Sequence, residues 1–250
     1  MLTFEEYGDG IGAGWTVIRE HANRAGSEAA VPTCPGWSVH DLVAHQGMVH
    51  RWATALLRGQ RSDTAALEAE GLAAVDQLDW FDQGVKALLQ VLADAPEDLD
   101  VAFFLADPPP ARLGWTRRQC HETTVHGVDA MSASFGRPPR AAETWIRPRL
   151  AADGVDELLT GFVPRPRTRL RSPEPHVVVV ETSDTGDAWT MTISEDPVVT
   201  VRERAERPDT VLSGTAAQLY LGLWNRGDEI TSEGAELLPR WRESMTVTWG

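Results

Sequence analysis

The chain has little cysteine and no long apolar run. Its two cysteines, Cys34 and Cys120, form no Cys-x-x-Cys pair and are too few for a disulfide framework. No stretch of about 18 consecutive apolar residues occurs, so we expect no membrane-spanning helix. Residues 1–6 are acidic and lack the basic-then-apolar order of a signal peptide. We therefore expect a reducing, cytoplasmic location, where any metal site would use histidine and carboxylate ligands.

Clustered positive charge is also missing. Acidic residues outnumber basic ones by 37 to 23, which gives a formal net charge of −14. The basic residues near 165–171 are interrupted by prolines. Such a chain repels phosphate backbones and anionic lipids, so we expect neither nucleic acid nor a membrane as a partner. At 250 residues, with 42% hydrophobic and 24% charged, it suits one large globular domain or two small ones.

The first half of the chain predicts an antiparallel bundle of four helices. Apolar residues recur at three- and four-residue steps, and Ser38 followed by Asp41 is typical of a helix N-terminus. The predicted helices span 4–24, 38–58, 80–95 and 113–135. Residues 60–75 are polar and alanine-rich and are interpreted as a loop or a frayed helix. The prolines at 108–110 keep 97–112 out of a helix.

The second half predicts a small α+β domain. A helix at 145–159 precedes a proline- and arginine-rich linker at 164–175, after which short alternating strands begin. The predicted strands are 177–180, 189–193, 198–201 and 210–212, and further helices are expected at 215–225 and 235–242. The fold class is therefore α+β, with a helical bundle at residues 1–140 and an α+β domain at 141–250.

The segment 117–130 carries the most informative side chains. It is expected to be helical, because it contains no proline, a single glycine and no period-two alternation. Glu122 and His126 then lie one turn apart on one face, and Asp129 continues that face. A carboxylate and an imidazole side by side can hold a divalent cation. Asp129 is either the group that orients His126 or a plain surface acid.

A third ligand has to come from another helix. The helix predicted at 38–58 has an apolar face formed by Leu42, Val49, Trp52 and Leu56. His45 lies in the middle of this face, whereas His40 and His50 point away from it. A histidine in such a position is either a core residue or a ligand. Because a Glu-x-x-x-His helix occurs in the same predicted bundle, we take His45 as the third ligand.

Three separated segments resemble the mycothiol-dependent maleylpyruvate isomerase family. They are residues 34–45, residues 117–130 with their His-Glu-Thr-Thr-Val-His core, and residues 211–226. In this family a DinB-like four-helix bundle precedes a small α+β domain akin to sterol-carrier folds. The resemblance extends over nearly the whole chain, and it implies the same architecture here.

The resemblance implies a zinc ion held by His45, Glu122 and His126, with water in the open position and mycothiol as cosubstrate. It also implies an active-site arginine at Arg226, which the helix pattern alone does not single out. Two histidines, one carboxylate and an open position are typical of catalytic zinc. Coordination deprotonates a thiol, so mycothiol's sulfur is expected to displace the water and become the nucleophile.

The implied chemistry is isomerisation of a maleyl-type diacid or transfer of the thiol to another small electrophile. Arg226 would bind a substrate carboxylate or stabilise developing enolate charge. Arg118 is expected to pair with Glu122 or with an anionic cosubstrate. Neither Cys34 nor Cys120 is expected to be the nucleophile, because one lies in a proline-glycine turn and the other on the apolar side of its helix.

Two other functions are compatible with the sequence. Zinc-bound water could act as a hydrolytic nucleophile, although no glutamate beside a ligand histidine matches the helix patterns of known hydrolases. Alternatively, the metal braces a binding or regulatory protein that has no turnover, because a fold alone does not establish an activity.

Overall fold

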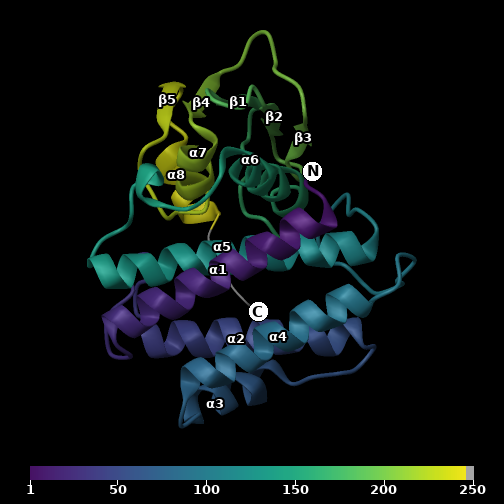
Figure 1. Cartoon of the computed structure of the whole chain (residues 1–250). Coiled ribbons are helices and arrows are strands. Elements are labelled where there is room, and N and C mark those ends of the chain that lie inside the picture. The colour runs from purple at the N-terminus through teal and green to yellow at the C-terminus, as the bar shows by residue number, and fades with distance from the viewer. Residues whose placement is uncertain (246–250) are drawn as a thin grey trace. The chain divides into compact units, whose positions relative to one another are not determined.

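The computed structural model describes residues 1–245, which form two compact units (Figure 1). The helical unit comprises Thr3–Phe103 and Pro109–Pro139. Of the described residues, the α+β unit comprises Met1–Leu2, Phe104–Pro108 and residues 140–245. A helical bundle is thus followed by a unit that contains a sheet with helices, and the predicted α+β class is confirmed.

The described residues of the helical unit form four long helices and a short one. These are α1 (Phe4–Ala25), α2 (Val39–Leu57), α3 (Thr64–Ala73), α4 (Gln77–Asp94) and α5 (Ala111–Phe135). Helix α1 packs along α5, and α2 packs against α3, α4 and α5 (Figure 1). Helix α2 begins with the predicted capping box, in which Ser38 and Asp41 satisfy each other's backbone N–H groups.

Of the two interpretations of residues 60–75, a loop or a frayed helix, the structure favours the helix, since a loop remains only outside Thr64–Ala73. Helix α3 is ordered over Thr64–Ala73, and it begins where the Asp63 carboxylate accepts hydrogen bonds from the backbone N–H groups of Ala65 and Ala66. Alanine has the highest helix propensity and aspartate is a favoured N-cap. Because the segment has no apolar stripe, its alanine content and the N-cap aspartate were not taken as evidence for a helix.

Glycines let neighbouring helices approach closely at two places. A Cβ added to Gly14 on α1 would lie 3.0 Å from the side chain of Thr123 on α5. A Cβ added to Gly47 on α2 would overlap the Trp80 ring on α4. Both close approaches depend on the absence of a Cβ at the glycine. The first of them seats α1 directly against the turn of α5 that contains Glu122.

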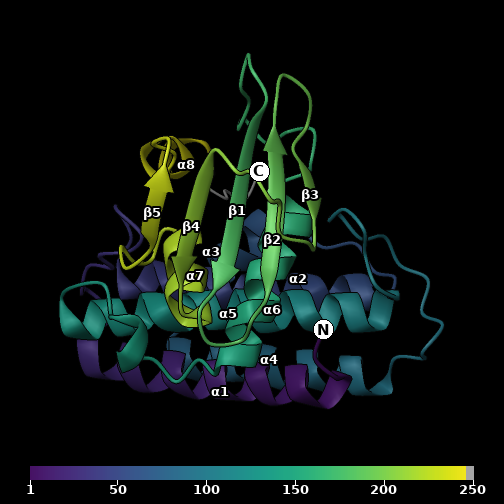
Figure 2. The same ribbon diagram turned by 90° about the horizontal axis from the view of Figure 1, so that it is seen from above.

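In residues 140–245, the α+β unit is built around a five-stranded sheet. Its strands are β1 (His176–Thr182), β2 (Ala188–Ile193), β3 (Val199–Val201), β4 (Thr210–Gly214) and β5 (Thr231–Gly234). Their order is β3-β2-β1-β4-β5, as Figure 2 shows from above, and only the β1–β4 pair is parallel. The centre of β1, Val178 to Val180, is fully buried, as expected for the middle strand of a covered sheet.

Helices complete the α+β unit. They are the short η1 (Ala141–Glu143), α6 (Pro148–Asp156), the π-helical η2 (Glu157–Phe162), α7 (Ala216–Leu223) and α8 (Leu238–Ser244). The predicted helix at 145–159 therefore starts later, at Pro148, which suits a first helical turn. Strand β5 was not predicted, because its four residues are all exposed and carry no alternating pattern. Of the helices in residues 1–245, none is long and apolar enough to cross a membrane.

Candidate metal centre

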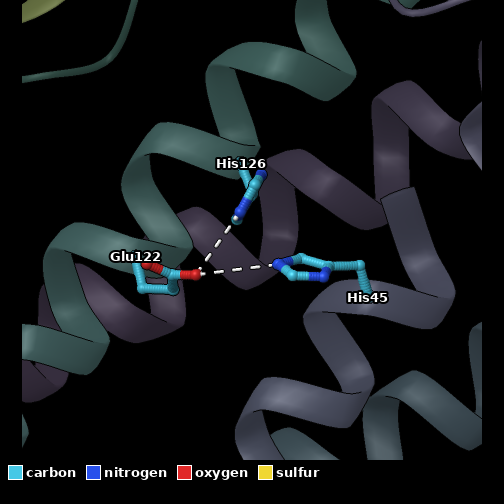
Figure 3. Close-up of side chains that lie close together, drawn as sticks. All are labelled: His45, Glu122 and His126. Carbon is cyan, nitrogen blue, oxygen red and sulfur yellow. Dashed lines mark ion pairs between the residues drawn. The ribbon is translucent and has the colours of Figure 1, made fainter. Parts of the chain in front are cut away.

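Three side chains from two helices converge inside the helical unit (Figure 3). His45 projects from α2, and Glu122 and His126 project from successive turns of α5. Glu122 Oε1 lies 3.4 Å from His126 Nε2 and 3.9 Å from His45 Nε2. One nitrogen or oxygen atom from each residue lies within 4.8 Å of the others. The structure thus brings together the three residues selected from the predicted helix faces.

Asp129 fixes the ring of His126 from behind. Its carboxylate is buried, and Oδ2 accepts a hydrogen bond from His126 Nδ1 at 2.9 Å. Asp129 is therefore not a surface acid, and its bond leaves Nε2 of the ring facing Glu122. Burial lowers the pKa of His126, but the hydrogen bonds with Asp129 and Glu122 outweigh burial and raise this pKa to about 9.

Glu122 is held in its charged form. Arg118, one turn earlier on α5, donates from Nη2 to Glu122 Oε2 at 2.9 Å, so the pairing of Arg118 with Glu122 is the observed one. Burial raises the pKa of Glu122, but the bond with His126 and the charge of Arg118 together hold this pKa far below its usual range. The second oxygen, Oε1, faces the two imidazoles.

His45 is neutral at physiological pH. Burial, assisted by the charge of His126, lowers the pKa of His45 to about 4. Its Nε2 faces Glu122, while Nδ1 lies 3.8 Å from a carboxylate oxygen of Glu68 on α3. A neutral imidazole whose ring nitrogen faces a carboxylate and a second imidazole is ready to act as a ligand.

The donor set fits a divalent transition metal. Two imidazole nitrogens and one carboxylate oxygen are the protein ligands of many catalytic zinc sites. Imidazole favours zinc, copper, iron and nickel, whereas magnesium and calcium prefer all-oxygen surroundings. The carboxylate behind His126 is the outer-shell partner that metal-bound histidines usually have. His45, Glu122 and His126 are therefore the residues of this chain that would hold such an ion.

The turn before α2 forms one wall of the centre. The ring of Trp37 lies 4.9 Å from that of His45 and is stacked on that of His126 at 6.1 Å, measured between centroids. A bridge between Ala30 and Ser38 closes the turn. The sequence analysis did not single out Trp37. Its place directly before the N-cap of the helix that carries His45 is the signal that could have identified it.

The apolar face of α2 does not mark the full extent of its buried surface, because His50, which points away from that face, is also buried. His50 is fully buried, and its Nε2 lies 3.0 Å from Thr123 Oγ1 and 2.7 Å from Gln46 Nε2. Burial lowers its pKa to about 3, so the ring is neutral. Because α2 packs against α3, α4 and α5, its buried surface is wider than the apolar stripe in the sequence.

Arg226 belongs to the α+β unit, where it follows α7. Its backbone N–H donates to the carbonyl oxygen of Leu221 at 2.7 Å, and its Nη1 donates to that of Trp224 at 2.8 Å. An active-site role for Arg226 stays a prediction. The two cysteines are placed as expected, since Cys120 is buried and Cys34 lies partly exposed in the turn before α2.

The fold and this centre define a protein with a histidine- and carboxylate-bearing helical bundle followed by an α+β unit. Residues 11–131 match the family model described as the mycothiol maleylpyruvate isomerase N-terminal domain. Residues 149–239 match the MDMPI C-terminal domain. The chain belongs to the mycothiol-dependent maleylpyruvate isomerase family.

Two solved structures are similar to the whole chain. Both are crystal structures of a mycothiol-dependent maleylpyruvate isomerase, one of them a histidine-to-alanine mutant. They are 14% and 13% identical to this chain with TM-scores of 0.63 and 0.62, and each comparison covers 93% of both chains. At this identity the likeness shows the fold. No curated protein matches the chain.

Proposed function

We propose that this protein is a metal-dependent enzyme that uses mycothiol to isomerise a maleylpyruvate-like diacid or to transfer the thiol to a small electrophile. The observation that carries the proposal is the convergence of His45, Glu122 and His126 in a chain of this family. Such a donor set leaves a coordination position for a ligand that is not protein. Zinc is the metal that we assign to it.

The protein residues prepare the centre for a thiol cosubstrate. When bound, a divalent cation lowers the pKa of a neighbouring thiol and so makes the thiolate available near pH 7. Glu122 supplies a fixed negative charge, and His45 supplies a neutral nitrogen without losing a proton. Asp129 and Arg118 keep the ligands on α5 in place through bonds of 2.9 Å each.

The isomerisation regenerates the thiolate that starts it. The thiolate sulfur forms a bond to one carbon of the cis double bond, and the π electron pair moves into the adjacent carbonyl group to give an enolate. Rotation about the new carbon–carbon single bond follows. The enolate then reforms the double bond in the trans geometry and expels the thiolate. In a transferase, the enolate carbon instead takes a proton from solvent, and the thioether product leaves.

Arg226 is proposed as the residue that recognises the anionic substrate. A guanidinium can bind a carboxylate through two parallel hydrogen bonds and can stabilise an enolate oxygen. A diacid substrate carries carboxylates, and an enolate oxygen forms when the thiol adds to it. The family resemblance supports this role. If Arg226 only caps the end of α7, it has no part in substrate recognition.

The hydrolytic alternative has less support. It needs a general base beside the metal. Besides Glu122, two acids in residues 1–245 face the ligand histidines. Asp129 is engaged by His126, and Glu68 faces Nδ1 of His45 on the side away from Glu122. Neither is placed to activate a water held between the three ligands.

Spectroscopy of the cobalt-substituted full chain tests the thiol step. Adding mycothiol should produce a sulfur-to-cobalt charge-transfer band, and the same protein should convert maleylpyruvate or a related cis diacid to its trans isomer. A band without turnover would support a different electrophile. A saturating thiol concentration that gives no band would refute the proposed function and favour a metal-braced binding protein.

The role of Arg226 is tested with Arg226→Ala. Turnover should fall by about 100-fold or more, the range measured for removal of a donor to developing negative charge. Metal content should not change. Arg240→Ala, at an exposed arginine of the same unit, is the matched control and should retain activity. Loss of metal in Arg226→Ala, or equal activity in the two variants, would contradict this role.

A further inference from the structure

Asp129 is engaged through both oxygens of its carboxylate. Oδ2 accepts the bond from His126 Nδ1 at 2.9 Å, and Oδ1 accepts a bond from the hydroxyl of Thr33 at 2.6 Å. We infer that Thr33 is a positioning residue of the metal centre, which acts through Asp129 to hold the His126 ring with Nε2 toward the metal. The inference rests on the proposed function, because it presupposes that His126 is a ligand.

The direction of these bonds follows from the chemistry of the groups. An ionised carboxylate can only accept, so Thr33 has to give its single hydroxyl hydrogen to Asp129. A short bond from a hydroxyl to a carboxylate belongs to the strong, charge-assisted class. Ser132 Oγ lies 2.9 Å from Thr33 Oγ1 and 2.7 Å from the Asp129 carbonyl oxygen, and it can give its single hydrogen to either of these acceptors. The carboxylate is thus fixed from two sides.

The backbone holds Thr33 in place. Thr33 lies in the turn before α2, where the N–H of Val31 donates to the carbonyl oxygen of Trp37 at 2.9 Å. The bridge between Ala30 and Ser38 closes the same turn. The ring of Trp37 packs on both imidazoles of the centre. A turn closed by two backbone contacts therefore touches the metal centre twice, through the hydroxyl of Thr33 and through the ring of Trp37.

The carboxylate that faces the other imidazole, that of Glu68, is held less firmly than that of Asp129. Glu68 lies 3.8 Å from His45 Nδ1, beyond hydrogen-bond distance, and its side chain is 44% exposed. Solvent screens such a pair, so its contribution is small. Asp129, in contrast, is completely buried. Asp129, which Thr33 contacts directly, is therefore held more firmly than Glu68 and can transmit an effect from Thr33 to the His126 ring.

The test measures zinc affinity of the full chain by competition with a chromophoric chelator. Thr33→Val keeps the shape of the side chain and removes the hydroxyl, and it should weaken zinc binding by about tenfold, the low end of the range for outer-shell partners. Thr33→Ser restores the hydroxyl and should restore the affinity. The matched control is Thr116→Val, a buried threonine of α5 whose hydroxyl donates to the carbonyl oxygen of Arg112. It should bind zinc like the wild type.

Thermal unfolding of each metal-free variant separates positioning from folding. Thr33→Val that loses stability but binds zinc as tightly as the wild type would overturn the inference, and so would Thr33→Ser that behaves like the valine variant. If the valine variant does not fold, Thr33→Ala gives the same comparison without an added methyl group. Failure of the wild-type chain to bind zinc would instead refute the proposed function, so the two failures are distinguishable.

Discussion

At the scale of single residues, the metal-free centre holds a proton where the metal would bind. The pKa of His126 is raised to about 9, because its bonds to two carboxylates outweigh its burial. Folding of the metal-free protein therefore gains stability from His126 below its ordinary pKa of about 6.5. This contribution is lost as the pH rises through 9. A cation that takes Nε2 has to expel that proton.

Zinc binding at pH 7 should therefore release close to one proton from the centre. His45, with a pKa of about 4, has none to release, and Glu122 is already ionised. Apparent zinc affinity should then rise by about tenfold per pH unit from pH 6 to 8, because proton and metal compete. Calorimetric titration in buffers of different ionisation enthalpy measures the proton count. A binding enthalpy that is independent of the buffer would contradict the charged state of His126.

At the scale of helices, the ligands on α5 depend on a neighbour that contributes no ligand. A Cβ added to Gly14 of α1 would lie 3.0 Å from the side chain of Thr123, the residue directly after Glu122, so one of the two helices would have to shift slightly. The close packing of α1 on α5 thereby fixes the height of the ligand-bearing turn. The metal centre therefore depends on three helices: α2 and α5 carry the ligands, and α1 supports α5.

Gly14→Ala should accordingly destabilise the protein by about 1–3 kcal/mol, the usual cost of an overpacked contact. The matched control is Gly12→Ala in the same helix, where an added Cβ meets nothing within 4 Å. That substitution should stabilise the protein by about 0.5–1 kcal/mol, because alanine is the better helix former. Urea unfolding of both metal-free variants measures the difference. Equal stabilities would show that α1 and α5 tolerate a wider separation.

At the scale of the whole molecule, a metal ion held by α2 and α5 joins segments that are distant in sequence. A ligand that binds only the folded chain stabilises it by mass action. Zinc at 100 times its dissociation constant should add about 2.7 kcal/mol to the free energy of unfolding. Thermal unfolding with and without a chelator measures this gain. Glu122→Gln should abolish the chelator effect, and a variant that keeps it would place the metal elsewhere.

Much of the molecule could be predicted because the signals are local. The spacing of Glu122 and His126 follows from helix geometry alone, and Ser38 with Asp41 marked the start of α2. His45 required a partner helix, so its selection depended on recognising the bundle. The helical bundle, the following α+β unit and the family were all predicted, and the comparisons confirm the family.

The remaining features depend on tertiary packing. Asp129 could not be distinguished from a surface acid, because its burial depends on the distant turn that contains Thr33. The burial of His50 could not be inferred from the sequence, because the apolar residues of α2 mark only part of its buried surface. Strand β5 has no pattern of its own and forms by pairing with β4. Sequence periodicity predicts a helix or strand by itself, whereas these features depend on the neighbouring segments that pack against that helix or strand.

The short excursion at Phe104–Pro108 has a consequence for how the chain can be divided. It lies between α4 and α5, yet it belongs to the α+β unit, where the N–H of Ala106 donates to the carbonyl oxygen of Gly161 at 3.2 Å. Neither unit is thus one uninterrupted segment. A single cut near residue 139 would separate the α+β unit from part of its own chain, because the sequence passes between the two units more than once.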